Sequence, residues 1–419
     1  MTKIKPLIQL REMIAAALSS MTNLSKTFEK FIIDTMQLFL TSSGRMNFTQ
    51  MARCSSSCES RFRQNFKKSF DWLSFNRHFL SPMMGHRIAI GIDPCFIPKA
   101  GKKTPGVDWF WSGCAGAIKH GLEILGLSVV DADAKDAVFL KAEQTFTQKC
   151  RGRKPKCTEG MDDPDSLTGW YLRMLCRISK QLLSICNLIV ADAYFSKESF
   201  VTGVKELGFN IISRFRDDVN LKYLYRGPKA RKRGRPQKFA GKVDLKHLDM
   251  NIFKEEYSVD DKLVYKLYTA DVWAVSLGRE VRVVIVDYLD TDKRTQARKV
   301  FFSTDLTLPA RDIFDIYRTR FQLEFVFRDA KQFTGLTHCQ ARNKEALAFA
   351  FNASLSSVNV ARAYARQQGH NLSVGSTKTL LHNAAMVDRF IAMSAKHANL
   401  RLNNTDFKEL LFYGVRAVA

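Results

Sequence analysis

The sequence contains no apolar run that could cross a membrane. Spanning requires roughly 18 uninterrupted apolar residues, and no stretch approaches that length. Near the N-terminus, the short apolar run Met13–Leu18 directly follows Arg11 and Glu12, which is typical of an amphipathic helix and not of a signal peptide. We therefore expect no membrane partner.

Paired cysteine motifs are also missing, although the chain has nine cysteines. Cys54 and Cys58 lie four positions apart, and Cys150 and Cys157 lie seven apart. Neither pair has the histidine or cysteine partners of a structural zinc site. The sequence thus favours reduced thiols in a cytoplasmic protein over a zinc-binding cluster.

Acidic residues are in the minority. The chain has 65 Lys and Arg against 41 Asp and Glu, which gives a net charge of +24. Such a chain is attracted to polyanions, because neutralising phosphates releases their counterions. Hydrophobic residues make up 46% of the 419 residues, enough for a sizeable core in two or three domains. Nucleic acid is the expected partner.

Residues 1–82 have the composition of a helical region rich in Phe, Met, Lys and Arg. Within this region, Asn47–Lys68 indicates two short helices around the polar turn Ser55–Ser57. The second helix would carry the basic residues Arg61, Arg63, Lys67 and Lys68. In a helix-turn-helix motif such a helix enters the major groove, whereas in a plain helical hairpin it presents a solvated basic face. Both interpretations remain open, because the turn lacks the usual Gly.

From residue 83 onward the pattern changes to strands alternating with helices. His86–Ile97 predicts a strand interrupted by Asp93, and Asn187–Asp192 predicts a shorter strand that ends in an acid. Further expected elements are strands at 107–114, 122–131 and 210–215, helices at 167–186 and 196–207, and a surface loop at 151–165. Strand, acid, helix and strand in this order indicate an α/β sheet whose functional residues lie at strand ends.

Residues 219–300 combine a basic loop with alternating strands. Arg233–Pro236 matches the core of an AT-hook, which lies in a narrow minor groove; the alternative is a solvated basic loop that contacts phosphates. In either case we expect DNA contacts from Lys229, Arg231, Lys232, Arg233 and Arg235. The stretches 257–268, 280–287 and 300–303 have the pattern of antiparallel strands, so a β-rich insertion is expected here.

A helix is expected from Pro309 to Gly335, because proline suits a first helical turn and glycine a helix end. One face of this helix would carry the stripe Tyr317, Arg320, Glu324 and Lys331, at spacings of three, four and seven residues. The rest of the helix is apolar and should be buried. The four polar side chains must then either satisfy one another or point into a cleft.

Three carboxylates could form one site. Asp93 interrupts an apolar strand, Asp192 ends another, and Glu324 lies on the polar stripe. Each alone has a structural explanation: a loop cap for the aspartates, and a salt bridge to Arg320 or Arg328 for the glutamate. As a set they suit two divalent cations about 4 Å apart, Mg²⁺ or Mn²⁺, acting on phosphodiesters. Arg320 and Lys331 could then hold phosphates, and Tyr317 could hydrogen-bond near the cleaved bond.

The spacing Tyr317-x₂-Arg320-x₃-Glu324-x₆-Lys331 resembles the Tyr-Arg-Glu-Lys signature of the insertion sequence 4 family of bacterial DDE transposases. The segments around Asp93 and Asp192 are similar to the blocks that carry the family's two catalytic aspartates, so the resemblance covers roughly residues 86–345. Two departures are Pro94-Cys95, where the family often has Asp-Thr, and Phe321, where it often has Trp. Both leave the three carboxylates in place.

The resemblance implies an α/β fold with an RNase H-like catalytic domain, interrupted by a β-rich insertion between the second aspartate and the glutamate. The expected boundaries are a helical DNA-binding region at 1–82, the catalytic domain at 83–218 and 301–345, the insertion at 219–300, and a helical C-terminal region at 346–419. Asp93, Asp192 and Glu324 would hold Mg²⁺ or Mn²⁺.

The activity implied is cleavage at the ends of a bacterial insertion sequence and joining of the freed 3′ hydroxyls to target DNA. The expected assembly is a homodimer on double-stranded DNA in the cytoplasm, at the nucleoid. The alternatives are a metal-dependent nuclease on the same fold, which cuts without joining, and a DNA-binding regulator without catalysis. A protein that only binds DNA has no need of three carboxylates facing its phosphates.

Overall fold

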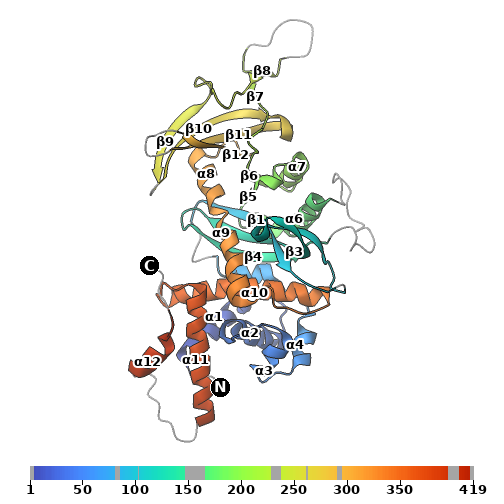
Figure 1. Cartoon of the computed structure of the whole chain (residues 1–419), viewed down its shortest axis with the longest axis vertical. Coiled ribbons are helices and arrows are strands. Elements are labelled where there is room, and N and C mark those ends of the chain that lie inside the picture. The colour runs from blue at the N-terminus through green and yellow to red at the C-terminus, as the bar shows by residue number, and fades with distance from the viewer. Residues whose placement is uncertain are drawn as a thin grey trace.

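The computed structural model describes residues 4–80, 85–101, 103–146, 166–227, 237–260, 263–289, 295–394 and 405–415. The molecule is elongated, with a β-rich end, a central α/β part and a helical base (Figure 1). The base contains α1 (Lys5–Ser19), α2 (Lys26–Thr41), α3 (Phe48–Arg53), α4 (Glu59–Asn65), α5 (Trp72–Arg77), α10 (Lys344–Gln367), α11 (Val374–Ser394) and α12 (Thr405–Phe412). Among the described residues, none of the helices combines the length and the apolar character needed to cross a membrane.

The central part is built on five strands in the order β4-β3-β1-β5-β6. These are β1 (Ile88–Pro98), β3 (Ala117–Asp131), β4 (Asp136–Gln144), β5 (Leu188–Val190) and β6 (Asn210–Arg214). β1 pairs antiparallel with β3 and parallel with β5, and β5 pairs parallel with β6. Helices α6 (Leu167–Leu183) and α7 (Glu198–Glu206) form the connections on either side of β5. This mixed α/β arrangement is consistent with an RNase H-like domain.

The remaining strands extend the same sheet. β2 (Asp108–Ser112) pairs with β3, while β12 (Thr295–Ser303) joins β6 to β11 (Arg279–Leu289) and β10 (Leu263–Ala274). The outermost strands at this end are β7 (Leu221–Leu224), β8 (Phe239–Lys242) and β9 (Lys254–Asp260). The single strand expected at 257–268 is wrong: β9 and β10 are separate strands that pair antiparallel, with Asp260 opposite Leu263. Polar and apolar residues alternate in both, so alternation alone did not separate them.

The helix α10 lies along β4, which among the described strands pairs with β3 alone. Asn352 accepts a hydrogen bond from Ala142 N (2.8 Å) and donates one to Ala142 O (2.9 Å). Asn359 makes the same pair of bonds to the backbone of Phe139. Both asparagines are buried, so these bonds satisfy polar groups that would otherwise be costly to desolvate. Side-chain amides thus attach the helical base to the sheet.

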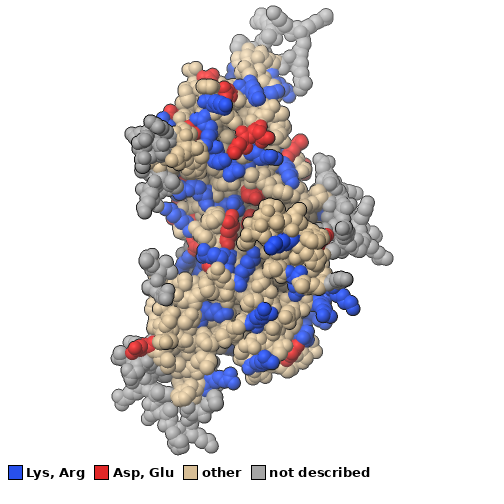
Figure 2. All heavy atoms as spheres, viewed as in Figure 1, with Lys and Arg blue, Asp and Glu red and all other residues tan. Residues whose placement is uncertain are grey.

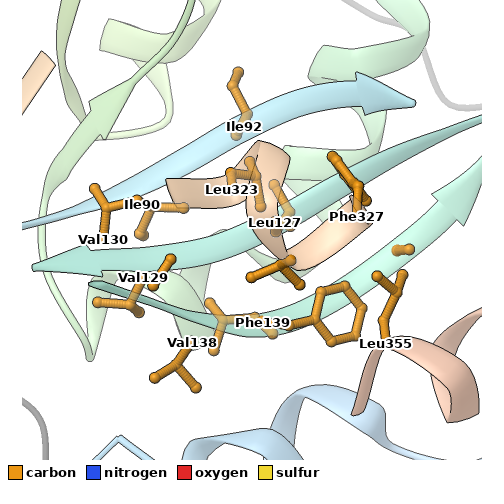
Figure 3. Close-up of a cluster of buried hydrophobic side chains, with 14 of the residues drawn as sticks. Ile90, Ile92, Leu127, Val129, Val130, Val138, Phe139, Leu323, Phe327 and Leu355 are labelled. Carbon is orange, nitrogen blue, oxygen red and sulfur yellow. The ribbon is translucent and has the colours of Figure 1, made fainter. Parts of the chain in front are cut away.

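A hydrophobic cluster joins three layers beside the central strands. Figure 3 shows Leu323 and Phe327 of one short helix directed at side chains of the sheet, with Leu355 of α10 on the far side. All three are buried, and so are the strand residues that the figure labels. This cluster fixes the position of the helix that carries Glu324.

Candidate active site

Asp93 and Asp192 are brought together by neighbouring parallel strands. The register of β1 and β5 places Gly91 opposite Val190, and each aspartate follows its strand's member of that pair by two residues. Neighbouring strands lie about 4.8 Å apart, so the register places the two carboxylates at one sheet edge. Asp192 also caps the short 3-10 helix η3 (Ala193–Phe195), accepting a hydrogen bond from Tyr194 N at 3.0 Å. The loop-cap explanation therefore applies to Asp192 alongside the functional one.

The segment that carries Glu324 is broken into three pieces: α8 (Ala310–Thr319), α9 (Gln322–Asp329) and the π-helical turn η5 (Ala330–Thr334). The single helix expected from Pro309 to Gly335 is therefore wrong. At the first break the Thr319 hydroxyl bonds to Asp315 O at 2.8 Å, and Phe321 N bonds to Arg318 O, three residues back. Hydroxyl bonds of this kind bend helices, and tightened or widened turns inside helices are frequent at functional sites.

Two glycines of the sheet let α9 approach closely. Gly126 pairs with Asp93 across β1 and β3, and a Cβ on Gly126 would lie 2.5 Å from the Phe327 ring. A Cβ on Gly91 would lie 3.1 Å from Val130 and 3.7 Å from Leu323. The contact that docks α9 is therefore directly opposite Asp93, and this docking places Glu324 beside the aspartates.

Arg320 lies between two of the three carboxylates. Its Nη1 is 3.3 Å from Asp93 Oδ1, and its Nη2 is 3.1 Å from Glu324 Oε1. The side chains of Arg320 and Asp93 are 13% and 15% exposed, whereas that of Glu324 is 41% exposed. The salt bridge that sequence offered as the plain explanation of Glu324 is thus present. Because Arg320 also forms an ion pair with Asp93, its guanidinium lies between two negative charges, where a cation is stabilised.

The two aspartates have perturbed acidities. Burial raises the pKa of Asp93 to about 7; the charges of Asp192 and Glu324 add to the rise, while Arg320 opposes it. Burial also raises the pKa of Asp192, again against the effect of Arg320. Carboxylates held in a low-dielectric, like-charged setting gain from a bound cation, and strongly shifted acids of this kind cluster at functional sites.

Tyr317 and Lys331 reach the same site from either side of Glu324. The Tyr317 ring lies 5.9 Å from the Arg320 guanidinium carbon, and burial raises the pKa of its hydroxyl. Burial raises the pKa of the Cys95 thiol to about 11, a rise opposed by the charge and hydrogen bond of Lys331. Lys331 therefore contacts Cys95, which lies two residues after Asp93. Cys95 belongs to one of the two departures from the family pattern.

Sequence reasoning missed Glu123 and Arg214. Glu123 is buried on β3, accepts a hydrogen bond from the Tyr171 hydroxyl at 2.6 Å, and interacts electrostatically with Asp93. Burial raises its pKa. Arg214, at the end of β6, interacts electrostatically with Asp192 and Tyr317. The signal for Glu123 was an acid inside an apolar strand, the same signal that identified Asp93.

The exposed face of α9 differs from expectation. The apolar residues of this segment were expected to be largely buried, yet Phe321, which immediately precedes α9, is 49% exposed. Its ring packs edge-on against Phe325 at 4.9 Å, and Arg328 covers Phe325 at 4.5 Å. The bend at Arg320 turns this side of the helix outward, which leaves an aromatic pair at the surface next to Glu324.

Two of the other residues expected to bind DNA, Arg61 and Arg63, lie on α4 in the helical base. Two short helices, α3 and α4, flank the serine turn as expected, but α4 ends at Asn65, so Lys67 and Lys68 lie beyond it. Arg63 forms an ion pair with Glu59, and Arg61 bonds to Ser57. Five of the basic residues expected to contact DNA lie outside the described residues: Lys229, Arg231, Lys232, Arg233 and Arg235. The loop expected at 151–165 and Cys150 and Cys157 do so too.

Within the described part of the chain, no three His, Cys, Asp or Glu side chains are grouped closely enough to hold a metal ion. At the acidic centre the carboxylates of Asp93 and Glu324 are held apart by the guanidinium of Arg320, which lies between them. The donor chemistry there still fits a hard cation, since carboxylate oxygens are the ligands that Mg²⁺ prefers. Cys54 and Cys58 are free and exposed.

Known protein families match both halves of this arrangement. The model described as DDE superfamily endonuclease matches residues 36–254, more than half of the chain, and includes Asp93 and Asp192. The chain therefore belongs to the DDE superfamily of endonucleases. A second model, described as Transposase DDE domain, matches residues 176–360 and includes Asp192 and Glu324. Together the matches support a transposase or endonuclease function. No curated protein gives a significant sequence match.

Proposed function

We propose that this protein is the DNA transposase of a bacterial insertion sequence, of the insertion sequence 4 type. It cleaves DNA at the ends of its element and joins the freed 3′ hydroxyls to target DNA. The proposal rests on one observation: Asp93 and Glu324 both contact the guanidinium of Arg320, and Asp192 lies just beyond the end of the adjacent strand β5. A charged cluster of this kind costs free energy when it is buried, so it is maintained for function.

Asp93, Asp192 and Glu324 would hold Mg²⁺ or Mn²⁺. When bound, such ions activate the attacking hydroxyl and stabilise the leaving 3′ oxygen. The chain's own residues then take the substrate: Arg320, released from its carboxylates, binds a phosphate oxygen together with Lys331, and Tyr317 hydrogen-bonds beside the cleaved bond.

The charge of the surface supports DNA as the substrate. Figure 2 shows Lys and Arg side chains spread from the β-rich end to the helical base. The proposal includes the region boundaries 1–82, 83–218, 219–300, 301–345 and 346–419, an RNase H-like catalytic domain interrupted by the insertion, and a homodimer on DNA at the bacterial nucleoid. It also includes DNA contacts by the basic loop of the insertion and by Arg61 and Arg63.

Cleavage by substituted proteins tests this function. Asp192→Asn and Glu324→Gln keep the shape of each side chain but remove a charge, so cleavage of DNA carrying the element's ends in Mg²⁺ should fall by about a hundredfold or more. Asp218→Asn, an exposed acid outside the site, is the matched control and should cut normally. The catalytic assignment is wrong if Asp192→Asn cuts as fast as the unmodified protein.

Pre-cleaved ends separate the proposal from its alternatives. A transposase joins such ends to a target plasmid, whereas a nuclease on the same fold cuts but yields no joined product. A DNA-binding regulator does neither, although it still binds DNA. Absence of joined product with intact cleavage would therefore leave the endonuclease and remove the transposase.

A further inference from the structure

A basic cavity lies beyond the carboxylates, at the far end of β1. Its volume is about 880 Å³, within the range of small-ligand sites. The residues that line it include the basic or imidazole side chains Arg45, Lys99, Lys103, His338 and Arg342, and none of the lining residues is acidic. A cavity of this composition attracts anions and repels cations.

Three segments of the chain form its walls. Residues 98–101, 103 and 104 lie at the end of the strand that carries Asp93 and just beyond it. Residues 337–340 and 342 follow the π-helical turn that carries Lys331, and Arg45 comes from the loop between α2 and α3. The cavity therefore joins the helical base to the two elements that supply the site.

Close backbone packing holds these walls together. Gly335 ends the π-helical turn with φ +76°, a left-handed conformation that favours glycine. A Cβ there would lie 2.9 Å from Met46 Cβ and 2.8 Å from His338 Nδ1. Met46 N donates a hydrogen bond to that same His338 nitrogen at 3.1 Å. The loop that carries Arg45 is thus fixed against the segment that carries Arg342.

The basic side chains of the cavity differ in their hydrogen bonding. His338 Nδ1 is an acceptor, so a neutral ring carries its proton on Nε2, and burial lowers the pKa of His338 and keeps the ring neutral. Lys99 donates to Cys339 O. Arg45, Lys103 and Arg342 are exposed, and no described acidic residue forms an ion pair with them. Their charges are available to a ligand.

We propose that this cavity binds the phosphates of a DNA strand that leaves the acidic centre, gripping them between Arg45 of the base and Arg342 of the catalytic part. The inference rests on the proposed function, because it takes the carboxylates as the place of cleavage. Five residues of strand separate Asp93 from Pro98, about 16 Å. At about 3.4 Å of helix axis per phosphate in each strand, the cavity meets the backbone about five nucleotides from the cut.

Binding measured in EDTA tests the cavity independently of cleavage. The probe is a random-sequence DNA duplex, and the variant is Arg45→Ala with Arg342→Ala. Lys180→Ala with Arg389→Ala is the control, because it removes the same charge from exposed positions on α6 and α11. The slope of log affinity against log salt should fall by about 2 in the cavity variant, one unit for each lost phosphate contact. The control should keep most of its slope.

Equal losses of slope in the two variants would overturn the proposal, since they would reflect net charge alone. A second arm places single neutral methylphosphonates along a duplex that contains the element's end. One position about five nucleotides from the cut should weaken binding of the unmodified protein and not of the cavity variant. If the affinity is the same for every methylphosphonate position, the cavity does not bind the DNA backbone and the proposal is wrong. The proposal is also wrong if the cavity binds inorganic phosphate tightly while its substitution leaves DNA affinity unchanged. Intact cavity binding with unchanged cleavage by Glu324→Gln overturns only the proposed catalysis.

Discussion

The two sides of the acidic centre are fixed by different forces. Asp93 and Asp192 come from paired strands, so backbone hydrogen bonds set their relative position. Glu324 comes from a short helix between two irregular turns, and its position depends on Leu323 and Phe327 packing over glycines. The relative position of Asp93 and Asp192 is thus fixed by the sheet itself, whereas Glu324 can be displaced without unfolding the sheet. Substitutions should separate these two sides.

The largest expected effect is on the strand side and depends on pH. Folding raises the pKa of Asp93 from 3.8 to about 7, because its carboxyl is buried beside like charges. Between these values the folded state holds a proton that the unfolded chain releases, so stability falls as pH rises through that window. In EDTA the loss should reach at most about 4 kcal/mol, measured by urea unfolding from pH 4 to pH 8.

Asp93→Asn is the control for this pH effect. The amide does not titrate, so the fall between pH 4 and pH 8 should shrink by the contribution of Asp93, and the remainder belongs to Asp192 and Glu123, whose pKa values burial also raises. Added Mg²⁺ should restore stability at pH 8 in the unmodified protein and much less in the variant. An unchanged pH profile in Asp93→Asn would show that another group causes the loss.

Arg320 links the two sides, and its removal should have the next largest effect. Arg320→Ala leaves Asp93 and Glu324 without their shared partner, so stability in EDTA at pH 8 should fall by about 3 kcal/mol. Mg²⁺ should raise the melting temperature of this variant more than that of the unmodified protein. Arg328→Ala removes a 54% exposed arginine on α9, eight residues further along the chain, and should cost far less. Equal losses in the two variants would argue against the bridging role.

The docking of α9 can be tested at Gly126. Gly126→Ala places a Cβ against the Phe327 ring and should lower stability by about 2 kcal/mol, measured by urea unfolding. Gly203→Ala is the matched control, since a Cβ there would lie 2.7 Å from Leu172, between α6 and α7. Both should be destabilised, but at full folding only Gly126→Ala should lose cleavage, because it displaces Glu324. Equal cleavage in the two would contradict the comparison.

The smallest effect concerns the bend before α9. Thr319→Val removes the hydroxyl bond to Asp315 O and should change stability by no more than about 1 kcal/mol. Cleavage should fall severalfold, because a straighter segment rotates Arg320 and Glu324. Thr377→Val, which removes the same type of bond in α11, should leave cleavage unchanged. If the Thr319→Val protein cuts DNA normally, packing alone maintains the bend and the hydroxyl bond is not needed for it.

The strand side was largely predictable from sequence, and the helix side only in part. An acid inside or directly after an apolar run marks a strand end, which is local information, and both aspartates were predicted as site residues this way. The stripe from Tyr317 to Lys331 was found from helical periodicity, yet the helix is broken within it. Helical periodicity does not depend on a single hydroxyl hydrogen bond or on a π turn, so the spacing of the polar residues could not predict the bend.

Features that depend on distant partners were missed. β4 was not expected, although residues 137–140 are apolar, because the strand is completed by β3 and by asparagines more than 200 positions later. The cavity at the far end of β1 needs three segments that only the fold brings together. Local patterns identified the carboxylates, while long-range packing decides what surrounds them.

The asparagines of α10 have one more consequence, for assembly. An edge strand with free backbone groups can recruit a strand from another molecule. At β4, Asn352 and Asn359 already occupy the positions that such a strand would take at Ala142 and Phe139. The sheet therefore cannot be lengthened at β4 by a strand from a second copy of the chain.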